Sequence, residues 1–157
     1  MDYSFIIRKA TEEDAEGIQS VMKKSFAKYV EDTGLKGTVE ALTETMDAIL
    51  SDIKNKEVYI ALVDGCPVGS IRAEIRDDKT AYITRFGVCP GNRNIGIGKS
   101  LINLIDKLLE SKGVRRAYLH TASNYSELVR FYYGRGFYIE SVSYDRGYPR
   151  ALMVKEI

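Results

Sequence analysis

Residues 93–99 combine small side chains with positive charge, which suits the binding of an anion. They read Arg-Asn-Ile-Gly-Ile-Gly-Lys and stand directly before an apolar stretch of helical period. Glycines let a loop turn sharply and let a ligand approach the backbone closely. At a helix N-terminus, such a loop offers converging N–H groups and the positive end of the helix dipole. The sequence therefore predicts a phosphate-binding loop at this point.

Three known phosphate-binding patterns compete for this loop, and their spacing distinguishes them. The P-loop pattern requires a glycine five positions before Gly98, where this chain has Arg93. The dinucleotide fingerprint Gly-x-Gly-x-x-Gly/Ala requires a small residue where this chain has Leu101. The third pattern, Arg/Gln-x-x-Gly-x-Gly/Ala, is met at every position by Arg93, Gly96 and Gly98. Because this pattern is short, its weight depends on the segments around it.

The segments on both sides of the loop resemble those of the GNAT superfamily of acyl-CoA N-acyltransferases. Residues 82–90, Tyr-Ile-Thr-Arg-Phe-Gly-Val-Cys-Pro, resemble the family's fourth strand and the turn that follows it. Residues 131–137, Phe-Tyr-Tyr-Gly-Arg-Gly-Phe, resemble its aromatic-Tyr-x-x-x-Gly-Phe segment. The expected order of elements also agrees over nearly the whole chain. The resemblance implies an acetyl-CoA-dependent N-acetyltransferase, in which a primary amine attacks the acetyl group directly in a ternary complex.

The resemblance also implies a set of cofactor-binding residues. Main-chain N–H groups of the loop would hold the coenzyme A pyrophosphate, and the preceding strand would pair with the pantetheine arm and donate an N–H to the acetyl carbonyl. The residues that match these family positions are Phe86, Gly87, Val88, Arg93, Asn94, Ile95, Gly96, Ile97, Gly98, Lys99 and Asn124. Gly87 also suits a bulge in its strand. Asn124 can either bind pantetheine or cap the following helix through Asn-x-x-Glu.

Two catalytic residues are expected. Tyr132 stands four residues before Gly136 and matches the family tyrosine that protonates the leaving thiolate, although a tyrosine of the core is the alternative. The general base is open, because Thr84 occupies a position where relatives often carry Glu. Glu74 on the neighbouring strand is the candidate base, and His120 is the second one. No metal is expected.

The identity of the acceptor amine stays open between a small molecule and a peptide. Acceptor specificity is expected from residues 29–37, from the second helix and from residues 144–148, where Glu31, Asp32 and Asp145 either hold a cationic substrate or face solvent. Family members are frequently dimers, which leaves a homodimer open. A non-catalytic acyl-CoA sensor or interaction module on the same fold is the alternative function, because a fold does not fix a function.

The elements that position these residues follow from hydrophobic periodicity and turn signals. A strand is expected from Phe5 to Lys9, followed by a helix that begins near Thr11 and runs to about Lys28. Thr38 would cap a second helix with Leu42, Met46, Ile49 and Ile53 along one face. Further strands are expected at 57–63, 68–76, 80–88, 116–121, 137–144 and 151–156, with helices at 98–112 and 124–135.

These elements predict one α/β (mixed α+β) domain over residues 1–157. The helix between strands 80–88 and 116–121 would make them parallel, since such a crossover joins parallel strands. The expected fold is a GNAT-like domain whose central sheet is mixed but mostly antiparallel. It would have about six to seven strands, a parallel pair at the fourth and fifth, and about four flanking helices.

Composition limits the partners and the compartment. The chain has 157 residues, 45% of them hydrophobic, and a net charge of +1, which is typical of a soluble globular domain. The charges are interspersed, so neither nucleic acid nor a membrane is expected as a partner. The N-terminal residues lack the pattern of a secretory signal, and we expect a cytoplasmic protein. Cys66 and Cys89 are not at metal-ligand spacing and are expected to be free thiols.

Overall fold

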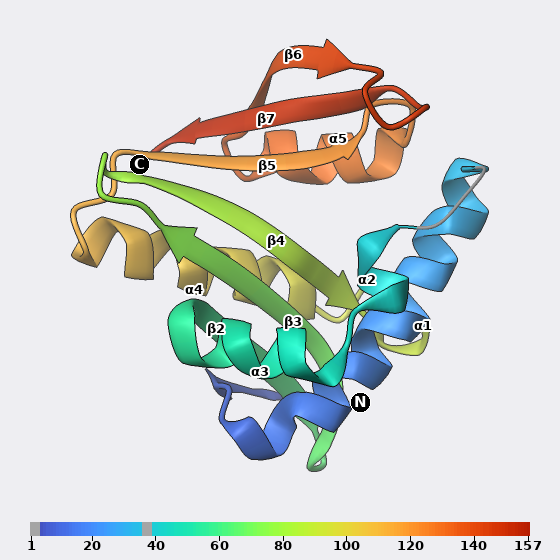
Figure 1. Cartoon of the computed structure of the whole chain (residues 1–157), viewed down its shortest axis with the longest axis vertical. Coiled ribbons are helices and arrows are strands. Elements are labelled where there is room, and N and C mark those ends of the chain that lie inside the picture. The colour runs from blue at the N-terminus through green and yellow to red at the C-terminus, as the bar shows by residue number, and fades with distance from the viewer. Residues whose placement is uncertain (1–3, 36–38) are drawn as a thin grey trace.

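The computed structural model describes residues 4–35 and 39–157, and in these ranges seven strands form one sheet (Figure 1). The strands are β1 (Ile6–Lys9), β2 (Glu57–Val63), β3 (Cys66–Ile75), β4 (Thr80–Val88), β5 (Arg116–Ala122), β6 (Tyr138–Ser143) and β7 (Arg150–Glu156). Their order is β1-β2-β3-β4-β5-β7-β6, and all neighbours are antiparallel except β4 and β5. The expected mixed sheet with a parallel fourth and fifth strand is therefore confirmed, in a single α/β domain.

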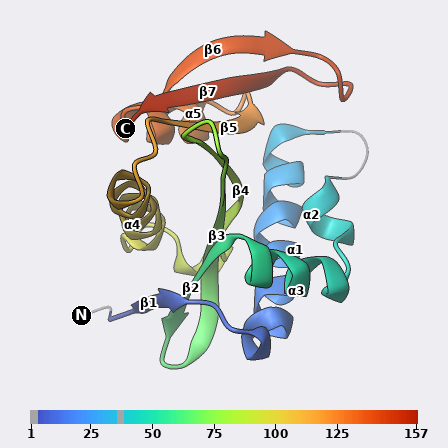
Figure 2. The ribbon, with the colours of Figure 1, turned by 60° about the vertical axis from the view of Figure 1, so that its left-hand side comes forward.

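Helices cover both faces of this sheet. In the described ranges they are α1 (Ala15–Thr33), α2 (Glu40–Thr43), α3 (Met46–Asn55), α4 (Ile97–Ser111) and α5 (Ser126–Gly134), with short 3-10 turns at η1 (Glu12–Asp14) and η2 (Pro90–Asn92). Figure 2 shows α1, α2 and α3 on one face and α4 on the other. The sheet is thus the middle layer of three, and its two faces carry separate apolar clusters.

Helix α4 is fixed to the sheet by an apolar stripe at helical spacing. Ile97, Leu101, Ile102, Ile105 and Leu109 are all buried, in the same cluster as residues of the central strands. Full burial of one such side chain contributes about 1.5–3 kcal/mol relative to leaving it exposed. The N-terminus of α4 is therefore held firmly beside the end of β4.

Helix α1 is longer than the periodicity predicts. It continues beyond Lys28 to Thr33 and ends where Gly34 adopts a left-handed conformation (φ 67°) and donates its N–H to the Val30 carbonyl at 3.0 Å. The expectation that this helix ends near Lys28 was therefore wrong. The last turns stay helical because Tyr29 packs against other aromatic rings, including that of Tyr125 at 6.0 Å. The extension places Tyr29 over the sheet.

The expected second helix is broken into α2 and α3. The break falls at Glu44, whose backbone is extended, and Thr45 then caps α3 by accepting the Ala48 N–H at 3.1 Å. Glu44 leaves the helical path because its carboxylate accepts two hydrogen bonds from the buried Arg72, at 2.7 and 2.8 Å. The expected cap at Thr38, like Gly37 and the N-terminal residues 1–3, lies outside the described residues.

Strands β4 and β5 run together for only three residue pairs and then separate. They pair from Thr80 with Arg116 to Tyr82 with Tyr118. Beyond that point β4 continues to Val88 with β3 alone on its other edge. Because the two strands diverge, the facing edges of β4 and β5 are unpaired beyond this point. The gap between them is where the candidate site lies.

A bulge bends β4 beside the gap. Ser70 pairs with Gly87 and Arg72 with Thr84, so Arg85 and Phe86 together stand opposite one residue of β3. Arg85 takes a left-handed conformation (φ 51°), as the first residue of one class of bulge does. The expected bulge exists, but Arg85 rather than Gly87 makes it.

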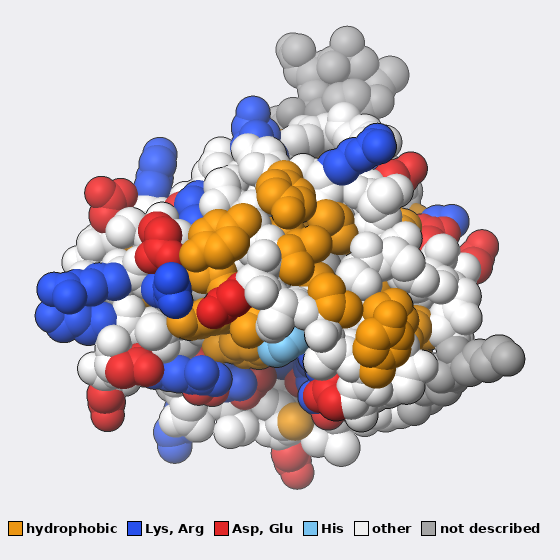
Figure 3. All heavy atoms as spheres, turned by 90° about the horizontal axis from the view of Figure 1, so that it is seen from above, with side chains coloured by type: hydrophobic (Ala, Val, Ile, Leu, Met, Phe, Trp, Pro, Cys, Tyr) orange, Lys and Arg blue, Asp and Glu red, His pale blue; other side chains and the backbone are white. Residues whose placement is uncertain are grey.

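Strand β6 forms the edge of the sheet next to β7. Figure 3 looks onto this end of the molecule, where apolar side chains gather at the surface. Tyr138, Val142 and Tyr144 are the large exposed apolar residues of β6 and of the turn after it. The strand contributes few side chains to the core, in contrast to β7, which is mostly buried.

Two further expectations concern the whole chain. Within residues 4–35 and 39–157, no helix has both the length and the apolar character that a membrane span requires. Cys66 is exposed and Cys89 is buried, and both are free thiols, as expected.

Candidate active site

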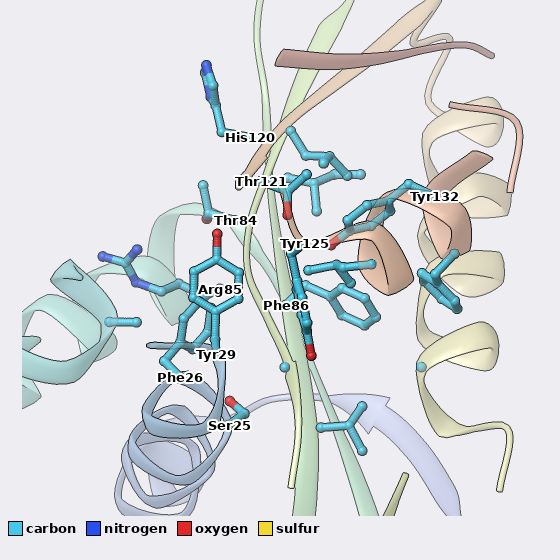
Figure 4. A pocket seen from close by; sticks show the side chains of 18 of the residues that line it. Ser25, Phe26, Tyr29, Thr84, Arg85, Phe86, His120, Thr121, Tyr125 and Tyr132 are labelled. Carbon is cyan, nitrogen blue, oxygen red and sulfur yellow. The ribbon is translucent and has the colours of Figure 1, made fainter. Parts of the chain in front are cut away.

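The gap between β4 and β5 opens into a cavity of about 900 Å³. Its walls come from α1, α2, β4, the loop before α4, β5, α5 and the start of β7. Figure 4 shows Tyr29 and Thr84 on one side of the strands and Tyr132 on the other. The volume lies in the range of cavities that enclose small ligands. The cavity therefore connects the two faces of the sheet through the open part of the gap.

One end of the cavity is the N-terminus of α4. Gly96 (φ 90°) and Asn94 (φ 65°) both have left-handed backbones, which turn the loop into the helix. The first helical hydrogen bond is donated by the Ser100 N–H to the Gly96 carbonyl at 3.0 Å. The N–H groups of Ile97, Gly98 and Lys99 precede it and so have no partner within the helix. No acidic residue stands in the first turn, which leaves this end positive.

Most of the loop residues expected to bind the cofactor line the cavity. Those that do are Phe86, Gly87, Val88, Arg93, Asn94, Gly96, Ile97, Gly98 and Lys99. Ile95 does not, because its side chain packs against the apolar cluster. Arg93 directs its Nε toward the Val88 carbonyl at 3.4 Å and so ties the loop to the end of β4.

The glycines of the site are required for different physical reasons. At Gly96 the backbone has a positive φ, which disfavours any residue with a Cβ. At Gly98 a Cβ would lie 3.4 Å from Phe86, which is an ordinary contact distance, but it would occupy the cavity wall. A Cβ at Gly87 would lie 2.3 Å from the Ser25 hydroxyl oxygen. Gly87 is therefore required by the close approach of α1 to β4.

Val88 presents its N–H to the open edge of β4. The next residue, Cys89, donates its N–H to the Val68 carbonyl on β3 at 2.8 Å. Consecutive residues of a strand direct their hydrogen-bonding groups to opposite edges. The N–H of Val88 therefore faces the gap, where no described strand pairs with it.

Tyr132 lies on α5 with its ring buried and its side chain lining the cavity. Its ring contacts Phe137, Phe131 and Phe86, with centroids 5.5 to 6.2 Å away. Burial raises the pKa of Tyr132 well above its usual value, and the nearby Tyr29 adds to the rise. The hydroxyl therefore stays protonated and can donate a hydrogen bond into the cavity.

Tyr29 reaches across the gap from the other face. Its hydroxyl accepts the N–H of Ala122, at the end of β5, at 2.8 Å. The buried Thr121 hydroxyl beside it lines the cavity and has no hydrogen-bond partner among the described residues. A ligand in the cavity would therefore find one unused buried hydroxyl at this point.

His120 and Tyr82 form a hydrogen-bonded pair on the wall opposite Tyr132. The Tyr82 hydroxyl contacts Nδ1 of His120, and both side chains line the cavity. Burial lowers the pKa of His120, and the charge of Arg150 lowers it further. The imidazole is therefore neutral near pH 7 and able to accept a proton.

Glu74 does not reach the cavity. It stands on β3 directly opposite Tyr82, but its carboxylate accepts a hydrogen bond from Arg76 Nε at 3.1 Å and pairs with Lys56 at 3.7 Å. It is absent from the cavity wall. Arg76 and Lys56 thus hold Glu74, the expected base, outside the cavity. The strand pattern alone does not reveal these two cations.

Asn124 and the expected acceptor acids also lie elsewhere. Asn124 is exposed and does not line the cavity, and α5 begins at Ser126 without a side-chain cap, so the expected capping box is wrong. Asp32 accepts the Tyr125 hydroxyl at 2.7 Å, and Glu31 pairs with Lys28. None of these acids, nor Asp145, lines the cavity.

A buried chain of charges supports the β4 bulge. Arg72 is fully buried and contacts Glu44 and, at 2.9 Å, Asp52. The same Glu44 carboxylate accepts a hydrogen bond from Arg85 Nε at 3.2 Å. Glu44 thereby fixes the bulged Arg85 at the cavity wall.

Sequence reasoning missed Arg85 and Arg150 as cavity residues, whereas Tyr29 and Arg146 lie in the segments 29–37 and 144–148 that were expected to determine acceptor specificity. Tyr29 follows Ser25 by four residues and so shares its helix face, which is a signal that could have placed it over the strand. The arginines carry no local signal, because their position depends on the bulge and on the pairing of β7 with β5.

Comparison with known proteins agrees with this geometry. The model of the acetyltransferase (GNAT) family matches residues 25–137. The uncharacterized protein YyaT of Bacillus subtilis (strain 168) is 32% identical over 92 residues, which span 58% of this chain and 60% of that relative.

Solved structures of other acetyltransferases share the fold. The PaiA N-acetyltransferase of Thermoplasma acidophilum, crystallised in complex with coenzyme A, superposes with a TM-score of 0.86 over 98% of this chain and 99% of its own, at 23% identity. The ribosomal-protein-S18-alanine N-acetyltransferase of Escherichia coli gives 0.79 over 98% and 94%, at 14% identity. Since the family model matches well over half of the residues and the fold agrees over nearly all of them, the chain belongs to the GNAT acetyltransferase family.

Proposed function

We propose that this protein is an acetyl-CoA-dependent N-acetyltransferase that transfers an acetyl group to a primary amine in a ternary complex. The observation that carries the proposal is one continuous cavity. It joins the positive N-terminus of α4 to a protonated tyrosine, Tyr132, and a neutral imidazole, His120. An anion site, an acid and a base in one cavity are the parts that acyl transfer from a thioester to an amine requires.

Coenzyme A would lie along the open edge of β4. The N–H groups of residues 97–99 would receive the pyrophosphate, and Lys99 would add its charge. The open edge of β4 would pair with the pantetheine arm as an added strand does. The Val88 N–H, which faces the gap, would stabilise charge on the acetyl oxygen, a contribution of about 3 kcal/mol in comparable sites.

His120 would remove the proton from the acceptor amine, directly or through one water. Glu74 is held outside the cavity by Arg76 and Lys56, which leaves His120 as the base that the geometry favours. When Nδ1 donates its proton to the Tyr82 oxygen, Nε2 keeps a lone pair with which to accept the proton. The neutral amine would then attack the acetyl carbon, and holding the two substrates together would lower the barrier further.

Tyr132 would protonate the leaving thiolate. Its buried ring fixes the hydroxyl at the cavity wall, and its raised pKa keeps the hydroxyl in the protonated form in which it can donate to the leaving sulfur. Burial in the same cavity would disfavour a free thiolate of coenzyme A and so favour proton transfer to its sulfur. The acid on α5 and the base on β5 lie on opposite walls, so the leaving group and the incoming amine would not compete for one residue (Figure 4).

A non-catalytic acyl-CoA sensor is the second candidate. Thr84 supplies no carboxylate, and none of the acids expected at the site reaches the cavity, which favours binding without turnover. The unused Thr121 hydroxyl would serve ligand binding in either case.

One experiment separates the two functions. Purified protein is titrated with coenzyme A by calorimetry and is then incubated with acetyl-CoA and a panel of amines while free thiol is measured. Binding together with amine-dependent thiol release supports the transferase. Binding without release from any amine supports the sensor, and the absence of coenzyme A binding contradicts both.

A further inference from the structure

Arg150, at the start of β7, is a buried cation with few partners. Its side chain is only 10% exposed, yet its nearest acid among the described residues is Asp145, whose oxygen lies 3.6 Å from Nη1 and already accepts a 2.9 Å hydrogen bond from Ser143. The Tyr82 hydroxyl, which also lines the cavity, is close enough to accept one N–H of Arg150. The remaining guanidinium N–H groups are not sealed in the protein interior, and the side chain lines the cavity. A ligand in the cavity can therefore supply charge-assisted acceptors for them.

The wall around Arg150 carries more positive than negative charge. Arg85, Arg146 and Arg150 line the part of the cavity away from the α4 N-terminus, and Glu40 is the one acid of the described residues that lines it there. Glu40 is shared between Arg146 at 3.7 Å and Arg85 at 3.6 Å. An acceptor with a second positive charge would meet two or three guanidinium groups at this wall.

The register of the sheet places Arg150 close to the proposed base. Arg150 pairs with Ala122, and His120 stands two residues earlier on β5, so the two are diagonal neighbours on one face. Such neighbours are about 7–8 Å apart along the sheet, within reach of one short ligand. Consistent with this, the charge of Arg150 adds to the lowering of the His120 pKa and opposes the rise that burial causes in the pKa of Tyr82.

We propose that the acceptor is a short amine that also carries an oxyanion, a carboxylate or a phosphate, which Arg150 binds while the amine faces His120. This inference rests on the proposed acetyltransferase function and names its substrate class. A guanidinium offers two parallel N–H groups that match the two oxygens of a carboxylate or phosphate. The occupant of this wall is therefore anionic, in contrast to the cationic group that Glu31, Asp32 and Asp145 led us to consider from the sequence.

Matched pairs of amines test the proposal. The rate of thiol release is compared for 3-aminopropanoate against propylamine, and for phosphoethanolamine against ethanolamine, with 1,3-diaminopropane as the cationic probe. We expect kcat/KM to be about 10- to 100-fold higher for the anionic member of at least one pair, the range for charge-assisted hydrogen bonds. The pair that shows the preference identifies carboxylate or phosphate. Equal rates within both pairs, or a preference for the diamine, would overturn the proposal.

Two variants assign the preference to Arg150. Arg150→Met keeps the long unbranched stem and removes the charge, and Arg130→Met removes one positive charge from an exposed position of α5 outside the cavity. Arg150→Met should abolish the preference between the two members of each pair, and Arg130→Met should preserve it. A preference that survives Arg150→Met contradicts the assignment. Unchanged thermal unfolding of both variants shows that the fold is intact.

A binding measurement keeps the inference separate from the proposed function. Protein saturated with coenzyme A is titrated by calorimetry with 3-aminopropanoate and phosphoethanolamine, and with propylamine and ethanolamine, which lack the oxyanion. Tighter binding of an anionic probe, lost in Arg150→Met, supports the oxyanion site even if no amine is acetylated. Failure of coenzyme A to bind counts against the proposed function, whereas normal coenzyme A binding without a preference for an anionic probe counts against this inference alone.

Discussion

The hydroxyl of Tyr29 accepts the N–H of Ala122 at 2.8 Å and thereby joins α1 to the open end of β5. Past the three residue pairs that β4 and β5 share, the two halves of the sheet have no ladder between them. This hydrogen bond is therefore a bridge across the gap that a ligand enters.

Tyr29→Phe should destabilise the fold by about 1–3 kcal/mol. The substitution keeps the ring but leaves the buried Ala122 N–H without its acceptor, and an unpaired buried donor costs this much. The free energy of unfolding in urea measures the effect. Tyr144→Phe removes the same hydroxyl from an exposed side chain and should change stability by less than about 0.5 kcal/mol. Equal stability of the two variants would show that the bridge contributes nothing.

Tyr132→Phe should lower kcat about 100-fold and leave the affinity for coenzyme A nearly unchanged, because only the proton donor is lost. Steady-state thiol release gives kcat, and calorimetry gives the affinity. Tyr133→Phe is the matched control, since its side chain is exposed and follows directly on the same helix. If both variants keep full kcat, Tyr132 is a tyrosine of the core and not the acid.

Gly96→Ala should weaken coenzyme A binding and destabilise the protein by about 1 kcal/mol. Its φ of 90° is unfavourable for alanine, so the loop must shift and carry the N–H groups of the α4 N-terminus with it. Gly91→Ala provides the comparison, because Gly91 lies in the preceding turn without a positive φ and with space around its Cβ. Calorimetric titration should give a higher Kd for Gly96→Ala only. The same Kd for both variants would exclude a role for the loop geometry.

Gly87→Ala should destabilise the protein, and Ser25→Gly should largely restore it. The added Cβ would lie 2.3 Å from the Ser25 oxygen and 2.9 Å from its Cβ, whereas without that side chain the nearest remaining contact is Met22 at 3.5 Å. Overpacking of this kind costs about 1–3 kcal/mol. Unfolding of the two single variants and the double variant forms a cycle, and simple additivity of the two changes would contradict the proposed contact.

The acetylation rate should rise with pH through a value below 6.5, the ordinary pKa of histidine. Burial and Arg150 lower the pKa of His120, so its neutral, basic form appears earlier than in an unfolded chain. The same shift affects stability. The folded form resists protonation, so its contribution to stability is present above the unfolded pKa and is lost as pH falls through the folded one. In His120→Gln, both the low-pH limb of the rate profile and this loss of stability should disappear. Profiles that match those of the unsubstituted protein would remove His120 from the mechanism.

The sequence was sufficient to predict the elements whose position depends on nearby residues in the chain. Strands 57–63 and 80–88 agree with β2 and β4 residue for residue, because alternating side chains and turn residues at Asp64 and Gly65 define them. The parallel pairing of β4 with β5 followed from the helix between them. These features depend on neighbours in the chain, which a single sequence displays.

Features that depend on distant partners could not be predicted. Nothing near Glu44 in the sequence indicates that it meets Arg72, so the break between α2 and α3 was missed. Glu74 alternates correctly for its strand, but Lys56 from the end of α3 helps to hold it away from the cavity. The roles of the loop residues and of Tyr132 remain predictions, which the variants above test.

The carboxylate of Glu44 is committed to two guanidinium groups at once, one on each of two neighbouring strands. Positions 44, 72 and 85 therefore form a unit that can be exchanged only as a whole. Replacing one of the three residues alone would leave a charge without its partner in the interior, at a cost of about 3–5 kcal/mol. Grafting the α2–α3 segment of a relative onto this scaffold, in order to alter which amine it accepts, would require transplanting the matching residues of β3 and β4 together with it.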